Sequence, residues 1–156
     1  MQYSEGAVGR VFALRLEHGE PMPETLETFA AEKNVAFGMV LMVGGADGGS
    51  KFIVGPENGD ALPPRPMMNV LSGVHEVAAV GTLFPDEEGH PRLHMHAAFG
   101  REDQTRAGCI RAGIVTWQVL EVILLEVTGL AAARRLDPKT GFHMLHCDLG
   151  GPQHDA

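Results

Sequence analysis

Residues 74–84 (VHEVAAVGTLF) and 92–99 (RLHMHAAF) decide the fold, because each is rich in the apolar and β-branched residues of a strand. The segment between them, residues 85–91 (PDEEGHP), is composed of residues that favour a turn. The sequence therefore predicts a β-hairpin. Its second strand carries His94 and His96, which lie two positions apart and so point to the same face of the sheet.

The two histidines are a candidate metal-binding pair. Cα atoms two residues apart on a strand are separated by roughly 6.5–7 Å, which allows both imidazoles to converge on one ion. Neutral imidazole is the commonest protein ligand for zinc and its neighbours. The same short pattern also occurs on half-exposed strands that bind nothing. From these two residues alone, a metal site and a pair of solvated histidines are both open.

A strand, a helix and a second strand are predicted before the hairpin. The apolar segment 8–17 predicts the first strand. Pro23 suits the first position of a helix, which continues with apolar residues at helical spacing and is closed by Lys33 and Asn34. Residues 35–43 form a nearly continuous apolar run, as expected for a strand covered on both faces. These three elements are predicted to form one unit.

The glycine-rich segment 44–49 (GGADGG) is predicted to be a flexible turn. Glycine loops can present backbone N–H groups to a phosphate, but this one has neither the G-x-G-x-x-G spacing nor the Lys-Ser/Thr of a P-loop. Residues 51–54, which follow it, read as a strand rather than a helix. Residues 55–66 contain four prolines and predict a surface loop that could cover a site or a neighbouring subunit.

After the hairpin, residues 100–112 are expected to be irregular and charged. Residues 114–127 predict one or two further strands, with a long apolar run in their second half. Residues 137–141 (DPKTG) predict a turn, and residues 142–149 a terminal strand. Residues 150–156 are expected to form a loose tail.

Composition limits the class of protein. The chain has 156 residues, the size of one domain, and 44% of them are hydrophobic, as in a globular protein. No secretory signal and no membrane span are visible, so we expect a cytoplasmic protein without membrane contact. Cys109 and Cys147 are then expected to be reduced thiols. The formal charge of −8 opposes binding to polyanions, so nucleic acid is not expected as a direct partner.

Residues 73–83 (GVHEVAAVGTL) are similar to the Gly-x-Phe-Glu-Ile-Leu-Ser-Leu-Ser-Gly-Ser stretch of the plants and prokaryotes conserved (PPC) domain family. The segment 9–17 (GRVFALRLE), the helix, the apolar strand, the glycine turn and the His-x-His follow in that family's order. The chain therefore resembles the standalone prokaryotic type of this family over about residues 8–147. The plant members carry in addition a DNA-binding AT-hook, whose Arg-Gly-Arg-Pro core is absent here.

The resemblance implies an α+β fold, with a mostly antiparallel or mixed β-sheet and a few helices. It implies a single PPC-like domain, which we assign to residues 8–149 after an N-terminal segment 1–7, and assembly as a homotrimer. In standalone members it also implies a metal held by the His-x-His pair and by a third histidine in a later Gly-Gly-His segment. That segment is Ala107-Gly108-Cys109 here. The implied ligand set is thus His94, His96 and Cys109.

Cysteine in the third position changes the expected chemistry. A thiolate remains a good zinc ligand, at about 2.3 Å against about 2.0–2.1 Å for a histidine nitrogen. We therefore expect Zn²⁺ or another divalent transition metal. The thiolate's negative charge makes metal-bound water less acidic than three imidazoles would, which disfavours hydrolysis. The alternative is that both histidines are solvated and Cys109 fills an apolar gap.

Other polar residues rank below these three. His75 and Glu76 are adjacent on a strand and so face opposite ways, which leaves His75 as a possible neighbour of the ligands or a cross-strand packing residue. Glu102 is the carboxylate chosen as a ligand-binding or general-base candidate. A further cluster could hold a second metal or lie at an interface: His143, His146 and Cys147. Surface or trimer contacts are expected of Arg10, Arg101 and Asp103.

Two classes of function follow. The first is a regulatory or binding module, a metal-containing trimer that binds a small molecule or anion, or a protein partner. The second is a metal-dependent enzyme in which an open coordination position takes water or a substrate carbonyl. We favour the first, because no obvious general base accompanies the three ligands in the sequence, and Glu102 is the carboxylate to test. DNA binding is the least expected function, since a trimer would carry three times the charge of −8.

Overall fold

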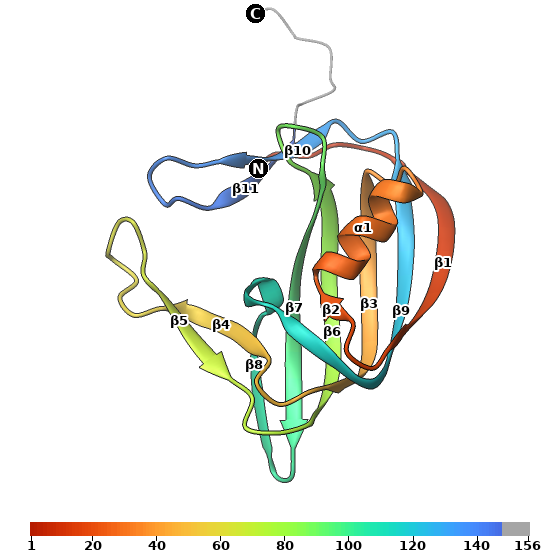
Figure 1. Cartoon of the computed structure of the whole chain (residues 1–156). Coiled ribbons are helices and arrows are strands. Elements are labelled where there is room, and N and C mark those ends of the chain that lie inside the picture. The colour runs from red at the N-terminus through yellow and green to blue at the C-terminus, as the bar shows by residue number, and fades with distance from the viewer. Residues whose placement is uncertain (148–156) are drawn as a thin grey trace, which may run out of the picture.

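A twisted antiparallel β-sheet forms the body of the protein, with one α-helix packed against one of its faces (Figure 1). The computed structural model describes residues 1–147. The tail predicted at 150–156, and the last two residues of the strand predicted at 142–149, lie outside the described residues. Within the described part of the chain, no helix has the length and apolar content needed to cross a membrane.

The main sheet contains nine strands in the order β1-β9-β3-β6-β7-β8-β4-β5, with β2 pairing to β9. A separate two-stranded sheet is made by β10 and β11. The helices are α1 (Glu24–Glu32) and the short 3₁₀ helix η1 (Ile110–Ala112). The strands are β1 (Ala7–Glu17), β2 (Pro21–Met22), β3 (Phe37–Ala46), β4 (Lys51–Pro56), β5 (Pro66–Val70), β6 (His75–Pro85), β7 (Pro91–Arg101), β8 (Gln104–Cys109), β9 (Ile114–Thr128), β10 (Ala132–Leu136) and β11 (His143–Cys147).

The predicted hairpin is confirmed as β6 and β7, which are in register from Glu76 opposite Gly100 to Pro85 opposite Pro91. The predicted first strand and helix are confirmed as β1 and α1. The three elements do not form one contiguous unit, however, because β9 lies between β1 and β3 and is antiparallel to both. All strand pairs formed within residues 1–147 are antiparallel, so the sheet is not mixed.

The prediction that residues 100–112 are irregular is wrong. They form the last two residues of β7, the turn after it, β8 and η1. Gln104 to Ala107 are exposed, so no apolar alternation marks this strand. It is specified instead by pairing with β7, through a tight turn in which Glu102 adopts a φ of 57°. Residues 114–127 belong to one strand, β9, with an irregularity beside Gln118, whose φ is 59°.

The core lies between α1 and the sheet face that it covers. Leu26 and Ala30 of α1 are fully buried, and they pack with inward-facing residues of the central strands. The largest buried side chains of the sheet include Phe52 and Phe99, whose ring centroids lie 4.7 Å apart. Other members of this core are Val40, Met42, Leu83, Met95, Leu120 and Leu124. This arrangement follows from alternation along each strand, which sends every second side chain inward.

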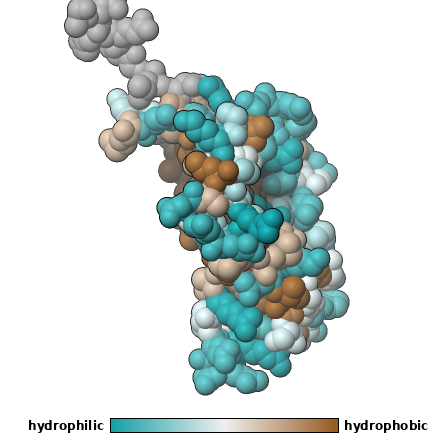
Figure 2. Space-filling model, turned by 90° about the vertical axis from the view of Figure 1, so that its left-hand side faces the viewer, coloured by the Kyte–Doolittle hydropathy of each residue, from teal (hydrophilic) through white to brown (hydrophobic). Residues whose placement is uncertain are grey.

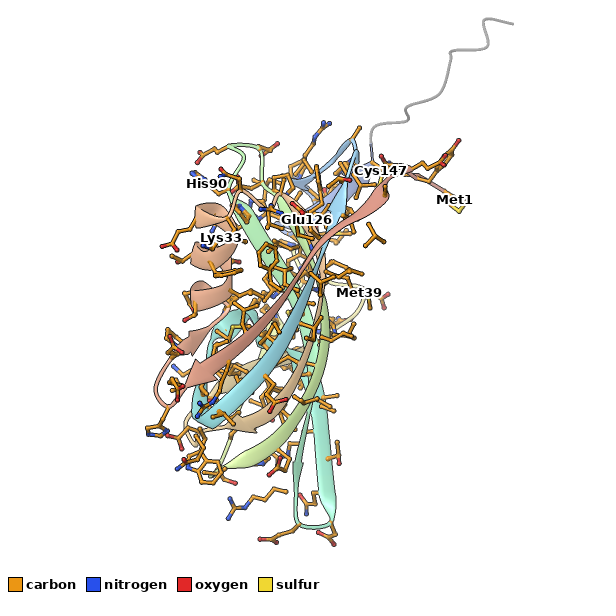
Figure 3. All side chains as sticks on the ribbon, turned by 90° about the vertical axis from the view of Figure 1, so that its right-hand side faces the viewer. Met1, Lys33, Met39, His90, Glu126 and Cys147 are labelled. Carbon is orange, nitrogen blue, oxygen red and sulfur yellow. The ribbon has the colours of Figure 1, made fainter. Side chains whose placement is uncertain are left out.

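The opposite face of the sheet is exposed in the single chain, so the chain itself covers only one face of the strand predicted at 35–43. Met39, Leu41 and Val43 of β3 are 42%, 48% and 54% exposed. Met39 projects from the sheet on the side away from α1 (Figure 3). The ladders place Ile123, Leu41, Val80 and His96 in one row across four strands. We call this side the outer face; its apolar surface reaches the histidine pair.

Candidate metal centre

The histidine pair and Cys109 meet where β8 leaves β7. His94 and His96 both project from the outer face of β7, as their spacing predicts. Cys109 is the last residue of β8 and pairs directly with His96. Residues directly opposite in an antiparallel ladder point to the same face, so the thiol joins the imidazoles. A strand that the sequence did not indicate therefore brings the third residue to the first two.

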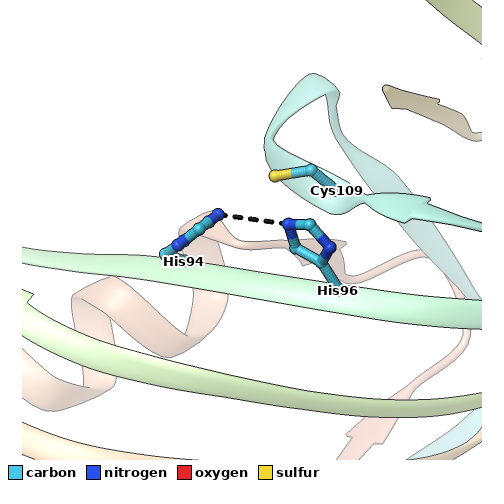
Figure 4. A group of neighbouring side chains, drawn as sticks. All are labelled: His94, His96 and Cys109. Atoms are coloured by element: carbon cyan, nitrogen blue, oxygen red, sulfur yellow. Dashed lines mark hydrogen bonds between the residues drawn. The ribbon is translucent and has the colours of Figure 1, made fainter. Parts of the chain in front are cut away.

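The three donor atoms are close enough to bind one ion. The Nε2 atoms of His94 and His96 are 3.2 Å apart and share a hydrogen bond, and the candidate ligand atoms of all three residues lie within 4.8 Å of one another (Figure 4). Around a tetrahedral zinc, bonds of about 2.0–2.3 Å place neighbouring donors about 3.3–3.6 Å apart. The separation of the two imidazole nitrogens is close to this range, and the thiol lies within 4.8 Å of the candidate ligand atoms of both histidines. The residues thus fit a zinc-like ion.

Cys109 is buried and lies between two paired strands, β7 and β4. Its side chain is only 3% exposed, and the residue also pairs with Ile53 of β4. A Cβ atom at Gly108 would collide with the carbonyl oxygen of Ile53 and would lie 2.8 Å from the Phe52 ring. Glycine is therefore required for β4 to approach β8 this closely. Because Gly108 has no side chain, β4 can pair with β8 beside Cys109, and the thiol is buried on the same face as the two histidines.

The surroundings of His94 favour its neutral form. Burial lowers the pKa of His94 below its ordinary value of 6.5, and the positive charges of Arg134, His96 and Arg111 act in the same direction. A metal binds the unprotonated imidazole nitrogen. At neutral pH, His94 is therefore in the protonation state that a ligand needs.

A cavity of about 470 Å³ lies beside His94. It is bordered by α1, β7, η1 and the β10–β11 hairpin, next to the part of β7 that does not pair with β8. Its polar lining comes from Glu27, Asp86, Arg92, His94, Arg111, Arg134 and His143, and its apolar lining from Pro23, Leu93, Phe142 and Met144. The side of the molecule with the two projecting hairpins is mostly hydrophilic, with only small hydrophobic patches (Figure 2). The cavity is thus suited to a polar ligand of metabolite size.

Glu27 brings a carboxylate to this cavity. Its Oε1 accepts a hydrogen bond of 2.8 Å from the backbone N–H of Leu93, and its Oε2 lies 3.7 Å from Nη1 of Arg92. Burial raises the pKa of Glu27 above its ordinary value, and the Leu93 N–H and Arg92 offset part of this effect. The interaction occurs because β8 does not pair with β7 at Leu93, which leaves that N–H free for a side chain.

The other residues chosen from the sequence lie elsewhere. Glu102 is in the turn at the far end of β7, at least roughly 16 Å from His96 at 3.3 Å per residue. His75 lies near the same end, where its Nδ1 is 2.8 Å from the carbonyl oxygen of Gly73. Neither is a neighbour of the three candidate ligands. Glu27, Arg111 and Arg134 were not singled out, because their proximity to His94 depends on how distant elements pack.

The structure does not bring the side chains of His143, His146 and Cys147 together. His143 borders the cavity beside His94, whereas His146 faces a separate hollow with Gln2 and Leu136. The backbone N–H of Cys147 donates to Oε1 of Gln2 at 3.1 Å. Within residues 1–147, these three side chains do not gather as a group that could hold one ion. Arg10 forms an ion pair with Glu126, and Arg101 donates to the carbonyl oxygen of Val74.

Comparison with known proteins relates this geometry to other chains. The family model of the Plants and Prokaryotes Conserved (PCC) domain matches residues 3–128. The match ends after β9, short of the residue 147 predicted from the sequence. The bifunctional protein GlmU of Synechococcus sp. (strain JA-3-3Ab) is 28% identical over 141 residues, which are 89% of this chain and 21% of that protein. This chain thus spans about a fifth of the length of the curated relatives it matches.

Solved structures share the fold at low sequence identity. A protein from Archaeoglobus fulgidus, described as metal-containing, has a TM-score of 0.81 at 21% identity, covering 94% of this chain and 99% of that one. A PPC protein from Pyrococcus horikoshii has a TM-score of 0.78 at 19% identity, with coverage of 96% and 99%. A protein from Bacteroides thetaiotaomicron, for which DNA binding is the suggested role, has a TM-score of 0.72 at 15% identity, with coverage of 91% and 97%.

Proposed function

Because the chain belongs to the Plants and Prokaryotes Conserved (PCC) domain family, we propose that it is a metal-binding module that holds a small ligand beside the metal. His94, His96 and Cys109 bind the ion. The observation that carries this proposal is the convergence of their donor atoms to within 4.8 Å. The Archaeoglobus protein of the same fold, which is described as metal-containing, adds support.

The donor set favours zinc over harder ions. Two imidazole nitrogens and one thiolate match zinc and similar transition metals, whereas magnesium and calcium prefer oxygen ligands. Three protein ligands leave a fourth tetrahedral position for water or for an atom of a bound ligand. The thiolate charge offsets part of the positive charge of the ion. This combination suits binding of a ligand better than activation of water.

Metal content tests the proposal directly. The full chain is purified without a histidine tag, treated with a chelator, incubated with zinc or magnesium, and analysed by mass spectrometry of the elements. We expect about one zinc per chain after the zinc treatment and no retained magnesium. Less than about a tenth of an ion per chain, even after zinc addition, would contradict the proposal.

A metal-dependent enzyme is the second candidate, and Glu27 is the observation that favours it. The carboxylate borders the same cavity as His94, and burial raises its pKa, so it can accept a proton from a bound ligand more readily than an exposed glutamate. A metal at this site would supply polarisation of a ligand oxygen. We expect any turnover of 4-nitrophenyl acetate or 4-nitrophenyl phosphate by the zinc-loaded chain to fall in Glu27→Gln with metal content unchanged. Glu24→Gln, on the same helix, is the control, and equal rates in wild type and Glu27→Gln would argue against this candidate.

Self-association as a homotrimer is part of the proposal. The open apolar residues of the outer face continue across the ladders to His96, so a second copy would cover that face and approach the metal. Sedimentation equilibrium should give about three times the chain mass of 16.7 kDa. Leu41→Glu, which places a charge in the middle of the open face, should give smaller species. A wild-type monomer at micromolar concentration would overturn the trimer.

Duplex DNA is not a proposed partner, although one protein of this fold has DNA binding as its suggested role. The AT-hook core is absent, and the chain carries a formal charge of −8. Such a charge repels phosphates at physiological salt. We expect no shift of duplex DNA at sub-micromolar protein in a mobility assay, and a shift would contradict this expectation.

A further inference from the structure

We propose that Arg134 and Arg111 form an oxyanion subsite beside the three candidate metal ligands, which binds the carboxylate or phosphate group of a small organic ligand. This inference rests on the proposed ligand-binding function and names its chemical class. Both arginines border the cavity that contains His94, one from β10 and the other from η1.

Arg134 is a buried positive charge that makes no direct ion pair in the described part of the chain. The residue is only 6% exposed. Its guanidinium donates to Oγ1 of Thr82 at 3.0 Å, to the carbonyl oxygen of Thr82 at 3.3 Å and to that of Arg92 at 3.4 Å. These acceptors are all neutral, and within residues 1–147 no carboxylate lies at ion-pair distance from it. A buried guanidinium is costly without a compensating negative charge, which a bound anion would supply.

Arg111 supplies a second positive charge to the same cavity. Its guanidinium carbon lies 4.9 Å from the centroid of the Phe142 ring, a stacking contact that orients the planar group. In the described part of the chain it has no ion-pair partner either. The third arginine of the cavity is different, because Arg92 is paired with Asp86 at 2.8 Å and with Glu27 at 3.7 Å. Among the three arginines of the cavity, Arg111 and Arg134 are therefore the two that make no direct ion pair with a described carboxylate.

The cavity also restricts the rest of the ligand. A volume of about 470 Å³ holds a small metabolite but not a polymer. Phe142 and Leu93 provide apolar wall, whereas Glu27 and Asp86 would repel a second anionic group. The guanidinium fork pairs with two oxygens of a carboxylate or a phosphate. The expected ligand therefore combines one oxyanion group with a partly apolar body.

Isothermal titration tests the subsite with phenyl phosphate and benzoate as probes, which share an apolar ring and differ in the oxyanion. The zinc-loaded full chain is titrated at constant ionic strength. We expect at least one probe to bind with a millimolar or lower dissociation constant, and the tighter one identifies the preferred oxyanion. Binding of neither probe below about 10 mM would overturn the subsite.

Variants assign the binding to the arginines. Arg111→Gln and Arg134→Lys should each weaken the better probe by about tenfold or more, because each removes charge-assisted hydrogen bonds or their fork geometry. Arg106→Gln removes an exposed arginine on β8 outside the cavity, and it should bind the probe as the wild type does. Both variants are checked for folding by circular dichroism, because Arg134 also donates to Thr82 and Arg111 stacks on the Phe142 ring. Unchanged affinity in Arg111→Gln would overturn the proposal.

Metal content is measured in the same samples, so the two proposals fail separately. Wild type and both arginine variants should hold the same amount of zinc. If the wild type holds none, the metal proposal fails, and arginine-dependent binding of the probe to the metal-free chain still decides the subsite. If zinc is present and the probe binds equally to all variants, the oxyanion subsite fails and the metal site stands.

Discussion

Two partly buried charged groups of the protein differ in whether they have an ion-pair partner. Where β1 meets β9, the carboxylate of Glu126 accepts three hydrogen bonds from Arg10, from its backbone N–H at 2.9 Å and from its guanidinium at 2.7 Å twice. Beyond β7, the guanidinium of Arg134 contacts only neutral acceptors among the described residues, beside two histidines and a thiol. The first arrangement is complete within one chain and serves stability. In the second arrangement, the guanidinium makes no direct ion pair with a described residue, and two imidazoles and a thiol lie nearby. Such groups can bind an anion or a metal ion from solution.

The largest effect is expected for zinc affinity at His94, His96 and Cys109. Cys109→Ser exchanges the proposed thiolate ligand for a hydroxyl, a poor zinc ligand, so zinc affinity should fall by at least about 100-fold. Competition with a chromophoric chelator measures the affinity. Cys147→Ser changes the other, half-buried cysteine and should leave zinc binding unchanged. Equal zinc affinity in the wild type and Cys109→Ser would remove the cysteine from the site.

A smaller effect is expected for the thermal stability that the ion pair between Glu126 and Arg10 provides. Glu126→Gln breaks the charged pair in a side chain that is only 10% exposed, and we expect the melting temperature to fall by roughly 5 °C. Zinc content should not change, because Glu126 lies three strands away from β7 in the sheet order. Glu57→Gln, which breaks the exposed 3.9 Å contact with Arg65, should shift the melting temperature far less. A loss of zinc in Glu126→Gln would contradict the assignment of Glu126 to stability alone.

The smallest effect is the pH dependence of the complete pair. The hydrogen bonds from Arg10 lower the pKa of Glu126 from its ordinary value of 4.5 to about 2. Because the pKa is lower in the folded state, the stabilisation is fully present above about pH 4.5 and is lost as the pH falls towards 2. The difference in unfolding free energy between wild type and Glu126→Gln should therefore be constant from pH 7 to about pH 5.5 and should shrink below pH 4.5. A difference that shrinks already near pH 6 would be inconsistent with this pair as its source.

Local pattern was enough to predict the hairpin that carries the histidines. Residues 74–84 and 92–99 have strand composition, and the turn between them is explicit in the sequence, so β6 and β7 follow. The same method fails for β8, because Gln104 to Ala107 are exposed and the strand exists only through its pairing with β7. It also fails for the outer face of β3, since a continuous apolar run does not tell which side a single chain leaves open.

The candidate metal ligands could be predicted from the sequence, whereas the residues around them could not. His94, His96 and Cys109 were predicted, the first two from spacing and the third from its place in a family motif, and the structure brings them together. Arg134 and Arg111 are ordinary arginines in the sequence. Their relevance depends on β10 and η1 bordering the same cavity, which requires tertiary contacts that no local pattern encodes. Glu27 borders the same cavity from α1, and a helical pattern does not indicate which cavity a helix will border.

Diffraction at the metal absorption edge is the most direct test of the central claim, that the open side of the sheet holds an ion. Crystals of the native, untagged chain are measured on both sides of the zinc edge after incubation with zinc. The account predicts one anomalous peak for each chain, within bonding distance of the side-chain nitrogens of His94 and His96 and of Sγ of Cys109. An absent peak, or a peak bound by other residues while these three stay unligated, would contradict it.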